Sequence, residues 1–437
     1  MSLPLLRSLA AAVALCLAVL WLSPAQAQSN DKKSRKKKTV AAVAVSAAGV
    51  AAAQRKKAVS GPADQGLHAE ARLIQIYQLI GQSKSRDALK LAEKLVADHP
   101  NFALAQLVYG DLLMAQIQPL RSLGDVPEAT VRAAPGVLSD LREESMLRMR
   151  ALRERPAPGL VPTNFVRLSA RNKHAIAVDA SRARVYLFEN TPQGLKLVAD
   201  YYASVGKMGV EKNIEGDLKT PLGIYFVTNT LDPNSLQDLY GAGALPINYP
   251  NPYDLRRGKT GSGIWLHGVP QAQFARAPKA TDGCVAVSNA DLQEILKRVE
   301  IRTTPVVILP KLEWGNSAQS SADVAAFDRA FAGWRSAKSG GDLERAMAHY
   351  TADFDSYGKK LSAMREIIHG EITKKRANEL KDMSALHWVE NGSSATMVVT
   401  FSEVPAGAVS GSTKRQYWLR SAATQNQWKI FFEGVIG

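Results

Sequence analysis

The residues best suited to chemistry in this sequence are His267 and Cys284. His267 ends a predicted strand over 263–269, and a loop of sixteen residues leads from it to Gly283 and Cys284, shortly before a predicted helix that begins near Asn289. The thiolate is the reactive form of cysteine, and a nearby imidazole can accept its proton. The pair therefore predicts a thiol nucleophile with a histidine base.

The residues around the cysteine favour the same chemistry. Gly283 permits a tight turn and a close approach of the backbone, so main-chain N–H groups near Gly283 and Cys284 are expected to face a developing oxyanion. The alternative is a buried, unreactive cysteine, because His-Gly and Gly-Cys pairs each occur often in turns and cores.

Four short motifs resemble the L,D-transpeptidase (YkuD-type) catalytic domain family. The family signature is His-Gly at a strand end followed by Ser/Thr-x-Gly-Cys, and the chain has His267-Gly268 and Thr281-Asp-Gly-Cys284. The segments 219–225 (Lys-Thr-Pro-Leu-Gly-Ile-Tyr) and 249–251 (Tyr-Pro-Asn) are also similar to family motifs. The resemblance covers roughly residues 164–312 and implies a mainly-β catalytic domain.

The resemblance implies a reaction on the peptide stems of peptidoglycan. Cys284 is expected to attack the carbonyl at the L-centre of the stem's diamino acid, expelling D-alanine and forming a thioester. His267 is the expected base and later the proton donor. An amine of a second stem, or water, then resolves the thioester. The remaining site residues are expected to orient the imidazole or contribute to the oxyanion site (Gly268, Thr281, Gly283) or to bind substrate (Tyr249, Trp265, Asp282).

Two positions depart from the family pattern and leave the outcome of the reaction open. Ala286 stands where many members carry Arg or Asn, and Asp282 stands where many carry His. Transfer to an amine, by cross-linking or protein attachment, is the first expectation; trimming or protein release by hydrolysis is the alternative. A third possibility is an inactive wall-binding scaffold. The resemblance implies that no metal or organic cofactor is required, and the other histidines show no metal-ligand spacing.

The beginning of the chain predicts export. Residues 1–27 combine Arg7, an apolar run and Ala25-Gln-Ala27, which is typical of a cleaved signal peptide, with an uncleaved anchor as the alternative. Residues 28–65 form an alanine-rich basic linker, in which nine Lys or Arg face one acid between positions 31 and 58. Such a segment favours anionic envelope surfaces, and without interleaved aromatic residues it does not predict a nucleic-acid partner.

The rest of the chain predicts a multidomain protein. Residues 66–155 have helical periodicity and resemble a tetratricopeptide repeat, residues 163–312 form the mainly-β catalytic domain, and 313–322 form a linker. Helices followed by strands over 323–437 resemble the α+β cones of the nuclear-transport-factor and SnoaL families. The expected partners are peptidoglycan stem peptides, together with other cell-wall proteins that the helical and C-terminal domains contact in the periplasm or cell envelope.

Overall fold

The computed structural model describes residues 62–316, 321–374, 378–390 and 394–436. The expected signal peptide at 1–27 and almost all of the basic linker at 28–65 lie outside these ranges. None of the helices within them is long and apolar enough to cross a bilayer. The described residues form a large unit of 62–125 and 137–437, and a small segment, 126–136, which contains the short helix α5 (Glu128–Ala133).

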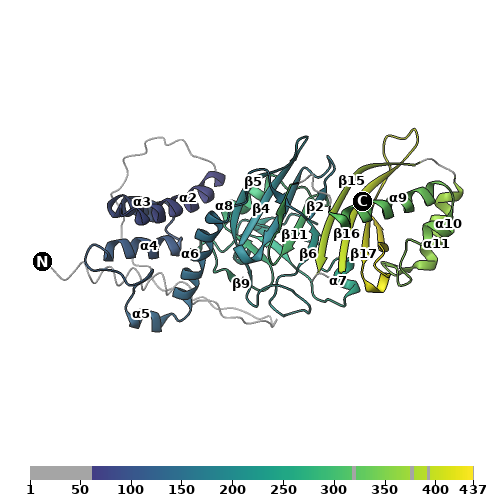
Figure 1. Ribbon diagram of the computed structural model, residues 1–437. Coiled ribbons are helices and arrows are strands. Elements are labelled where there is room, and N and C mark those ends of the chain that lie inside the picture. The colour runs from purple at the N-terminus through teal and green to yellow at the C-terminus, as the bar shows by residue number, and fades with distance from the viewer. Residues whose placement is uncertain (1–61, 317–320, 375–377, 391–393, 437) are drawn as a thin grey trace, which may run out of the picture. The chain divides into compact units, whose positions relative to one another are not determined.

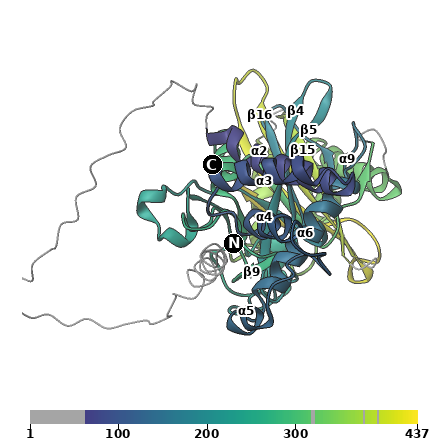
Figure 2. The same ribbon diagram turned by 90° about the vertical axis from the view of Figure 1, so that its left-hand side faces the viewer.

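Four helices of the large unit precede the central domain, where the periodicity predicts a helical region. They are α2 (Pro62–Gly81), α3 (Ser85–Asp98), α4 (Ala103–Met114) and α6 (Val137–Arg153). The helix α3 buries Ala88, Ala92 and Leu95, residues spaced to share one face, against its neighbours. Figure 2 shows α2, α3, α4 and α6 toward the viewer. The tetratricopeptide resemblance of this region stays a prediction.

The central domain is built on a mixed sheet, which confirms a mainly-β unit. The strand order is β6-β11-β3-β4-β5-β10-β8-β7, with β9 paired to β5. The strands are β3 (His174–Asp179), β4 (Arg184–Thr191), β5 (Gly194–Gly206), β6 (Gly223–Phe226), β7 (Ala244–Pro246), β8 (Trp265–His267), β9 (Lys279–Thr281), β10 (Val285–Val287) and β11 (Pro305–Leu309). Two short helices accompany them, α7 (Pro252–Arg256) and α8 (Asn289–Leu296).

The sheet is apolar on both faces because each face packs against another element. In the predicted hairpin of β3 and β4, Val178 is opposite Val185 and belongs to a core that includes Leu292 of α8. Phe188 belongs to a second core, on the other face, which includes Trp388 from the C-terminal segment. This explains why the strand cores are continuous apolar runs instead of alternating with polar residues.

The C-terminal segment has α+β architecture. Its helices α9, α10 and α11 lie beside the strands β15, β16 and β17 (Figure 1). The elements are α9 (Ala322–Ser339), α10 (Leu343–Met347), α11 (Leu361–Thr373), β13 (Asp355–Ser356), β14 (Lys359–Lys360), β15 (Asn378–Glu390), β16 (Ser394–Pro405), β17 (Ser412–Arg420) and β18 (Lys429–Val435). Its resemblance to a nuclear-transport-factor cone stays a prediction.

The boundary between the central domain and the C-terminal segment is crossed by a strand. The sheet order of the C-terminal segment is β18-β17-β16-β15-β2, and β2 (Phe165–Arg167) comes from the start of the segment expected to be catalytic. A nearby two-stranded ladder joins β1 (Val161–Pro162) to β12 (Trp314–Gly315). The chain therefore enters and leaves the central domain at the same place, where β1 and β12 pair.

A buried ionic network connects the N-terminal helices to the sheet. Arg148 of α6 lies 2.7 Å from Glu70 of α2 and 2.7 Å from Glu144, and its side chain is 2 % exposed. Arg184 of β4 lies 2.8 Å from the other oxygen of Glu70. The guanidinium of Arg148 also stacks over the Tyr202 ring of β5 at 3.9 Å. Burial alone raises the pKa of Glu70, but the two arginines outweigh it and lower that pKa to about 2.

We expect Arg148→Ala to lower the free energy of unfolding by about 3–5 kcal/mol, because it leaves two buried carboxylates with less compensation. The matched control is Arg150→Ala in the same helix, whose side chain is 47 % exposed in its pair with Glu154; its effect should be below about 1 kcal/mol. Urea denaturation followed by circular dichroism measures both variants. Equal effects of the two substitutions would show that the network does not stabilise the fold.

Candidate active site

The turn before β10 holds Cys284 through its neighbours. The Thr281 hydroxyl donates to the Cys284 carbonyl at 2.7 Å and accepts from the Gly283 amide at 3.2 Å. Gly283 has φ +128°, and a Cβ there would lie 2.8 Å from the Lys219 carbonyl oxygen, so a side chain is excluded. The buried Thr281 thus fixes the turn by two hydrogen bonds. The Gly283 N–H, which was expected to face an oxyanion, already donates to Thr281.

His267, at the end of β8, is fixed by the residue that follows it. Its Nδ1 lies 2.6 Å from the Gly268 carbonyl oxygen. A carbonyl only accepts, so Nδ1 carries the hydrogen and Nε2 keeps a free lone pair. A Cβ on Gly268 would lie 2.2 Å from Oδ1 of Asn289, which itself accepts from the Val269 amide at 3.1 Å. The side chain of Asn289 therefore fixes the loop that orients the imidazole.

The pairing of β8 with β10 brings the segments that carry the two candidate catalytic residues side by side. The strands run parallel, with Val285 opposite Leu266 and Ala286 opposite His267. Cys284 immediately precedes β10, at the level where β8 begins. Cys284 and His267 therefore lie on neighbouring segments, although sixteen residues separate them in the chain.

Burial makes both groups neutral at rest. It raises the pKa of Cys284 to about 11, against which the backbone hydrogen bond from Trp265 acts weakly, and the Cys284 thiol lies 3.5 Å from the Gly263 carbonyl oxygen. Burial also lowers the pKa of His267 to about 4. The resting pair is thus a thiol and a neutral imidazole, and not the thiolate–imidazolium pair that would lower the thiol pKa.

Two residues that the sequence did not single out flank this pair. The Tyr240 ring lies edge-on to His267 at 5.1 Å and against Trp265 at 4.7 Å. Arg276 lies in the loop between His267 and Cys284. Burial is the main cause of the lowered pKa of His267, and the positive charge of Arg276 lowers it further. The same charge lowers the pKa of Cys284, against the larger effect of burial. The guanidinium has no hydrogen bond or ion pair with any residue in the described ranges. A lone arginine in a loop carries no sequence signal, so only the fold identifies it.

The three residues expected to bind substrate differ in position. Trp265 is half-buried beside Tyr240, at the site. Asp282 is exposed and lies 2.9 Å from Lys207 at the edge of the turn. The Tyr249 ring, by contrast, is 5 % exposed, packs in the core and donates to the Thr260 carbonyl at 3.0 Å. The prediction for Tyr249 is corrected: burial leaves its ring no surface for a substrate.

A metal centre has no set of ligands in the part of the chain that the structure describes. No group of three or more His, Cys, Asp or Glu side chains there could hold a metal ion.

The fold and the site together define a domain with an oriented imidazole at the end of one strand and a thiol directly before the parallel neighbour of that strand. Residues 173–308 match the family model of the L,D-transpeptidase catalytic domain (YkuD), so the chain contains a domain of this family. The match confirms the resemblance seen in the motifs. Domains of this family act on peptidoglycan stem peptides.

The similarity to solved structures covers more of the chain than this domain. Bd1075 of Bdellovibrio bacteriovorus is 25 % identical with a TM-score of 0.51, and the match covers 63 % of this chain and 98 % of that one. The helical cell shape determining protein Pgp2 of Campylobacter jejuni is 20 % identical with a TM-score of 0.49, covering 67 % and 99 %. No curated protein sequence matches the chain.

We expect alkylation of Cys284 by iodoacetamide to accelerate about tenfold per pH unit from pH 6 to 9 without levelling, because the thiolate fraction rises until the pKa of about 11. Quenched-flow labelling with mass spectrometry measures the rate, and Cys284→Ala corrects for labelling elsewhere. Free cysteine, with a pKa of about 8.5, should level within the same range. A plateau below pH 7 would instead reveal a thiolate–imidazolium pair.

Proposed function

We propose that the protein is a peptidoglycan L,D-transpeptidase that uses Cys284 as the nucleophile and His267 as the base. The observation that carries the proposal is the neutral imidazole held by the Gly268 carbonyl on the strand parallel to β10. A neutral base with a free Nε2 can take the thiol proton as the sulfur attacks, so a pre-formed thiolate is not needed.

The reaction divides into two acyl transfers. His267 Nε2 accepts the thiol proton while Sγ adds to the carbonyl between the diamino acid and D-alanine. The tetrahedral intermediate collapses, the imidazolium protonates the leaving amine, and a thioester remains on Cys284. An amine of a second stem then adds to the thioester, giving its proton to His267, and the thiol is regenerated. The peptide bond lost in the first step is replaced by the one formed in the second.

The positive charge of Arg276 complements the terminal carboxylate of the proposed substrate. The donor stem ends in a carboxylate, adjacent to the bond that is cleaved. A half-buried guanidinium without a described partner, close to both Cys284 and His267, offers several N–H donors to such a group. We assign Arg276 to binding the terminal carboxylate, in place of the basic residue that Ala286 does not provide.

Hydrolysis is the second candidate outcome. Ala286, 2 % exposed, presents only a methyl group where many family members carry Arg or Asn. Without a polar side chain there to hold an amine acceptor, water can resolve the thioester and trim the stem. The two outcomes share the acyl-enzyme and differ only in the second nucleophile.

An envelope location is part of the proposal. Its support is the apolar, basic-led segment at 1–27 and the substrate class of the catalytic domain family. The basic segment at 28–65 and the helical and C-terminal domains are proposed to hold the catalytic domain against the wall or against other cell-wall proteins.

Purified protein should release D-alanine from disaccharide-tetrapeptide, and His267→Gln should slow this release about 10²–10⁴-fold, the usual contribution of a general base. Cys284→Ala should abolish it. His369→Gln, which removes an exposed imidazole from α11, is the matched control and should leave the rate unchanged. Chromatography of the products distinguishes cross-linked dimers from tripeptides. Release that persists in Cys284→Ala would exclude the thiol mechanism.

Arg276→Met should raise KM for a tetrapeptide stem about 10–100-fold, since a hydrogen bond to a charged group contributes about 1.5–3 kcal/mol. The same variant should change KM for a stem with an amidated C-terminus by less than about threefold, because that substrate lacks the charge. Arg329→Met, on the exposed side of α9, is the control. An equal loss on both substrates would contradict carboxylate binding.

A further inference from the structure

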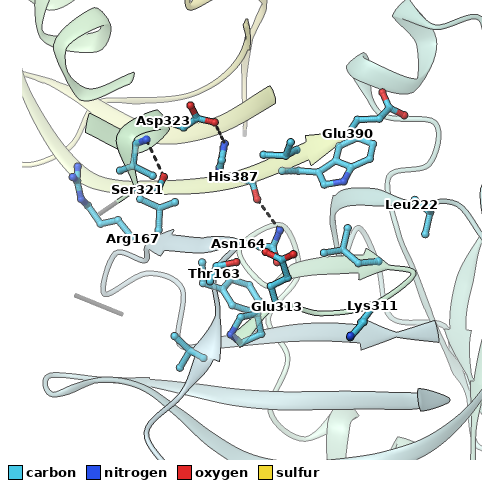
Figure 3. A pocket seen from close by; sticks show the side chains of 18 of the residues that line it. Thr163, Asn164, Arg167, Leu222, Lys311, Glu313, Ser321, Asp323, His387 and Glu390 are labelled. Atoms are coloured by element: carbon cyan, nitrogen blue, oxygen red, sulfur yellow. Dashed lines mark hydrogen bonds and ion pairs between the residues drawn. The ribbon is translucent and has the colours of Figure 1, made fainter. Parts of the chain in front are cut away.

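A groove of about 1040 Å³ lies where the central sheet meets the C-terminal sheet, apart from the catalytic turn. Its walls are β1 and β2 with the residues between them, the chain following β11, and the end of β15. Phe165, Leu309 and Trp388 are among its apolar lining residues. Figure 3 shows polar side chains that line it, among them Asn164, Lys311, Glu313 and His387. A groove of this size and lining is typical of a ligand site.

Two residues that line the groove carry buried polar atoms without a hydrogen-bond partner among the described residues. Asn164 is 8 % exposed; its Nδ2 donates to the His387 carbonyl at 2.9 Å, whereas its Oδ1 has no partner among the described residues. Nε2 of His387 makes no hydrogen bond either and lies 3.8 Å from Asp323. Because a buried acceptor without a partner is costly, both atoms are suited to a hydrogen-bonding ligand.

The charges of the lining residues select the kind of ligand. Five lining residues are acidic and two are basic. Asp323, Asp328 and Glu390 have arginine partners. The exposed carboxylates of Glu211 and Glu313 and the ammonium of Lys311 have none among the described residues. This surplus of carboxylates repels acidic stem peptides but accepts hydrogen bonds from hydroxyl groups, so it favours an uncharged, polyhydroxylated ligand.

The groove shares a loop with the catalytic turn. Glu211 and Leu222, which line the groove, belong to the connection between β5 and β6. The same connection holds Thr220, whose hydroxyl lies 3.5 Å from the Cys284 carbonyl oxygen. Only one residue separates Thr220 from Leu222. The groove and the catalytic turn are therefore connected through one short segment of this loop.

We propose that this groove binds the uncharged glycan strand of peptidoglycan whose stem peptide is acted on at Cys284. The ring hydroxyls and acetamido groups of the strand hydrogen-bond to Asn164, Glu313 and Lys311, and its apolar sugar faces lie against the apolar lining residues. The inference rests on the function proposed above for its substrate, but the groove can be tested without catalysis.

The binding test uses full-length Cys284→Ala protein and uncharged oligomers of β-1,4-linked N-acetylglucosamine, because strands freed of their stems by an amidase carry a lactyl carboxylate on every second sugar. Titration calorimetry should show binding that Glu313→Ala weakens about fivefold or more and that Thr163→Trp, which fills the groove from an exposed position, abolishes. Glu366→Ala, an exposed carboxylate on α11, is the matched control and should leave binding unchanged. Binding that needs peptide stems, or that is indifferent to Glu313→Ala and Thr163→Trp, would overturn the proposal.

A kinetic test separates this proposal from the proposed function. In protein with Cys284 intact, Glu313→Ala should raise KM for glycan-linked tetrapeptide about fivefold and leave KM for the free tetrapeptide unchanged. If neither substrate is turned over while the glycan still binds, the proposed function fails and the groove stands. If both substrates are turned over and Glu313→Ala changes neither KM, the groove proposal fails alone.

Discussion

The parallel pairing of β8 with β10 is the constraint on which the site depends. It sets the segment that carries Cys284 beside the strand that carries His267, in a sheet that is packed on both sides. Each partner is then fixed locally, Cys284 by Thr281 and His267 by Gly268 and Asn289. Because these supports are hydrogen bonds to the backbone, the geometry of the turn and of the imidazole is preorganised.

Burial makes the resting thiol of Cys284 less reactive and at the same time protects it. It holds Cys284 as a thiol, the form less prone to oxidation, and it holds His267 as a neutral imidazole. The thiolate then forms only when a substrate carbonyl can accept the electrons. Arg276 is a nearby cation without a described partner, and it is the group that we propose to bind the terminal carboxylate of the substrate.

Much of the central fold could be predicted from local patterns, and the site only in part. The β3–β4 hairpin, β5 and β11 have long apolar runs that periodicity detects, and the motifs around His267 and Cys284 carry the family resemblance. The strand β10 has three residues and β7 and β9 have three each, too short for a pattern. Arg276, Tyr240 and the burial of Tyr249 depend on tertiary packing, and so does the placement of β2 in the C-terminal sheet.

The most direct measurement is the intact mass of the protein during turnover of disaccharide-tetrapeptide, followed by peptide mapping. The account predicts a covalent adduct with the mass of the donor less D-alanine, located on Cys284 and labile to hydroxylamine as a thioester is. His267→Gln should prevent its accumulation. An adduct on any other residue would contradict the account. So would turnover by wild-type protein with no acyl-enzyme detected even when no amine acceptor is present.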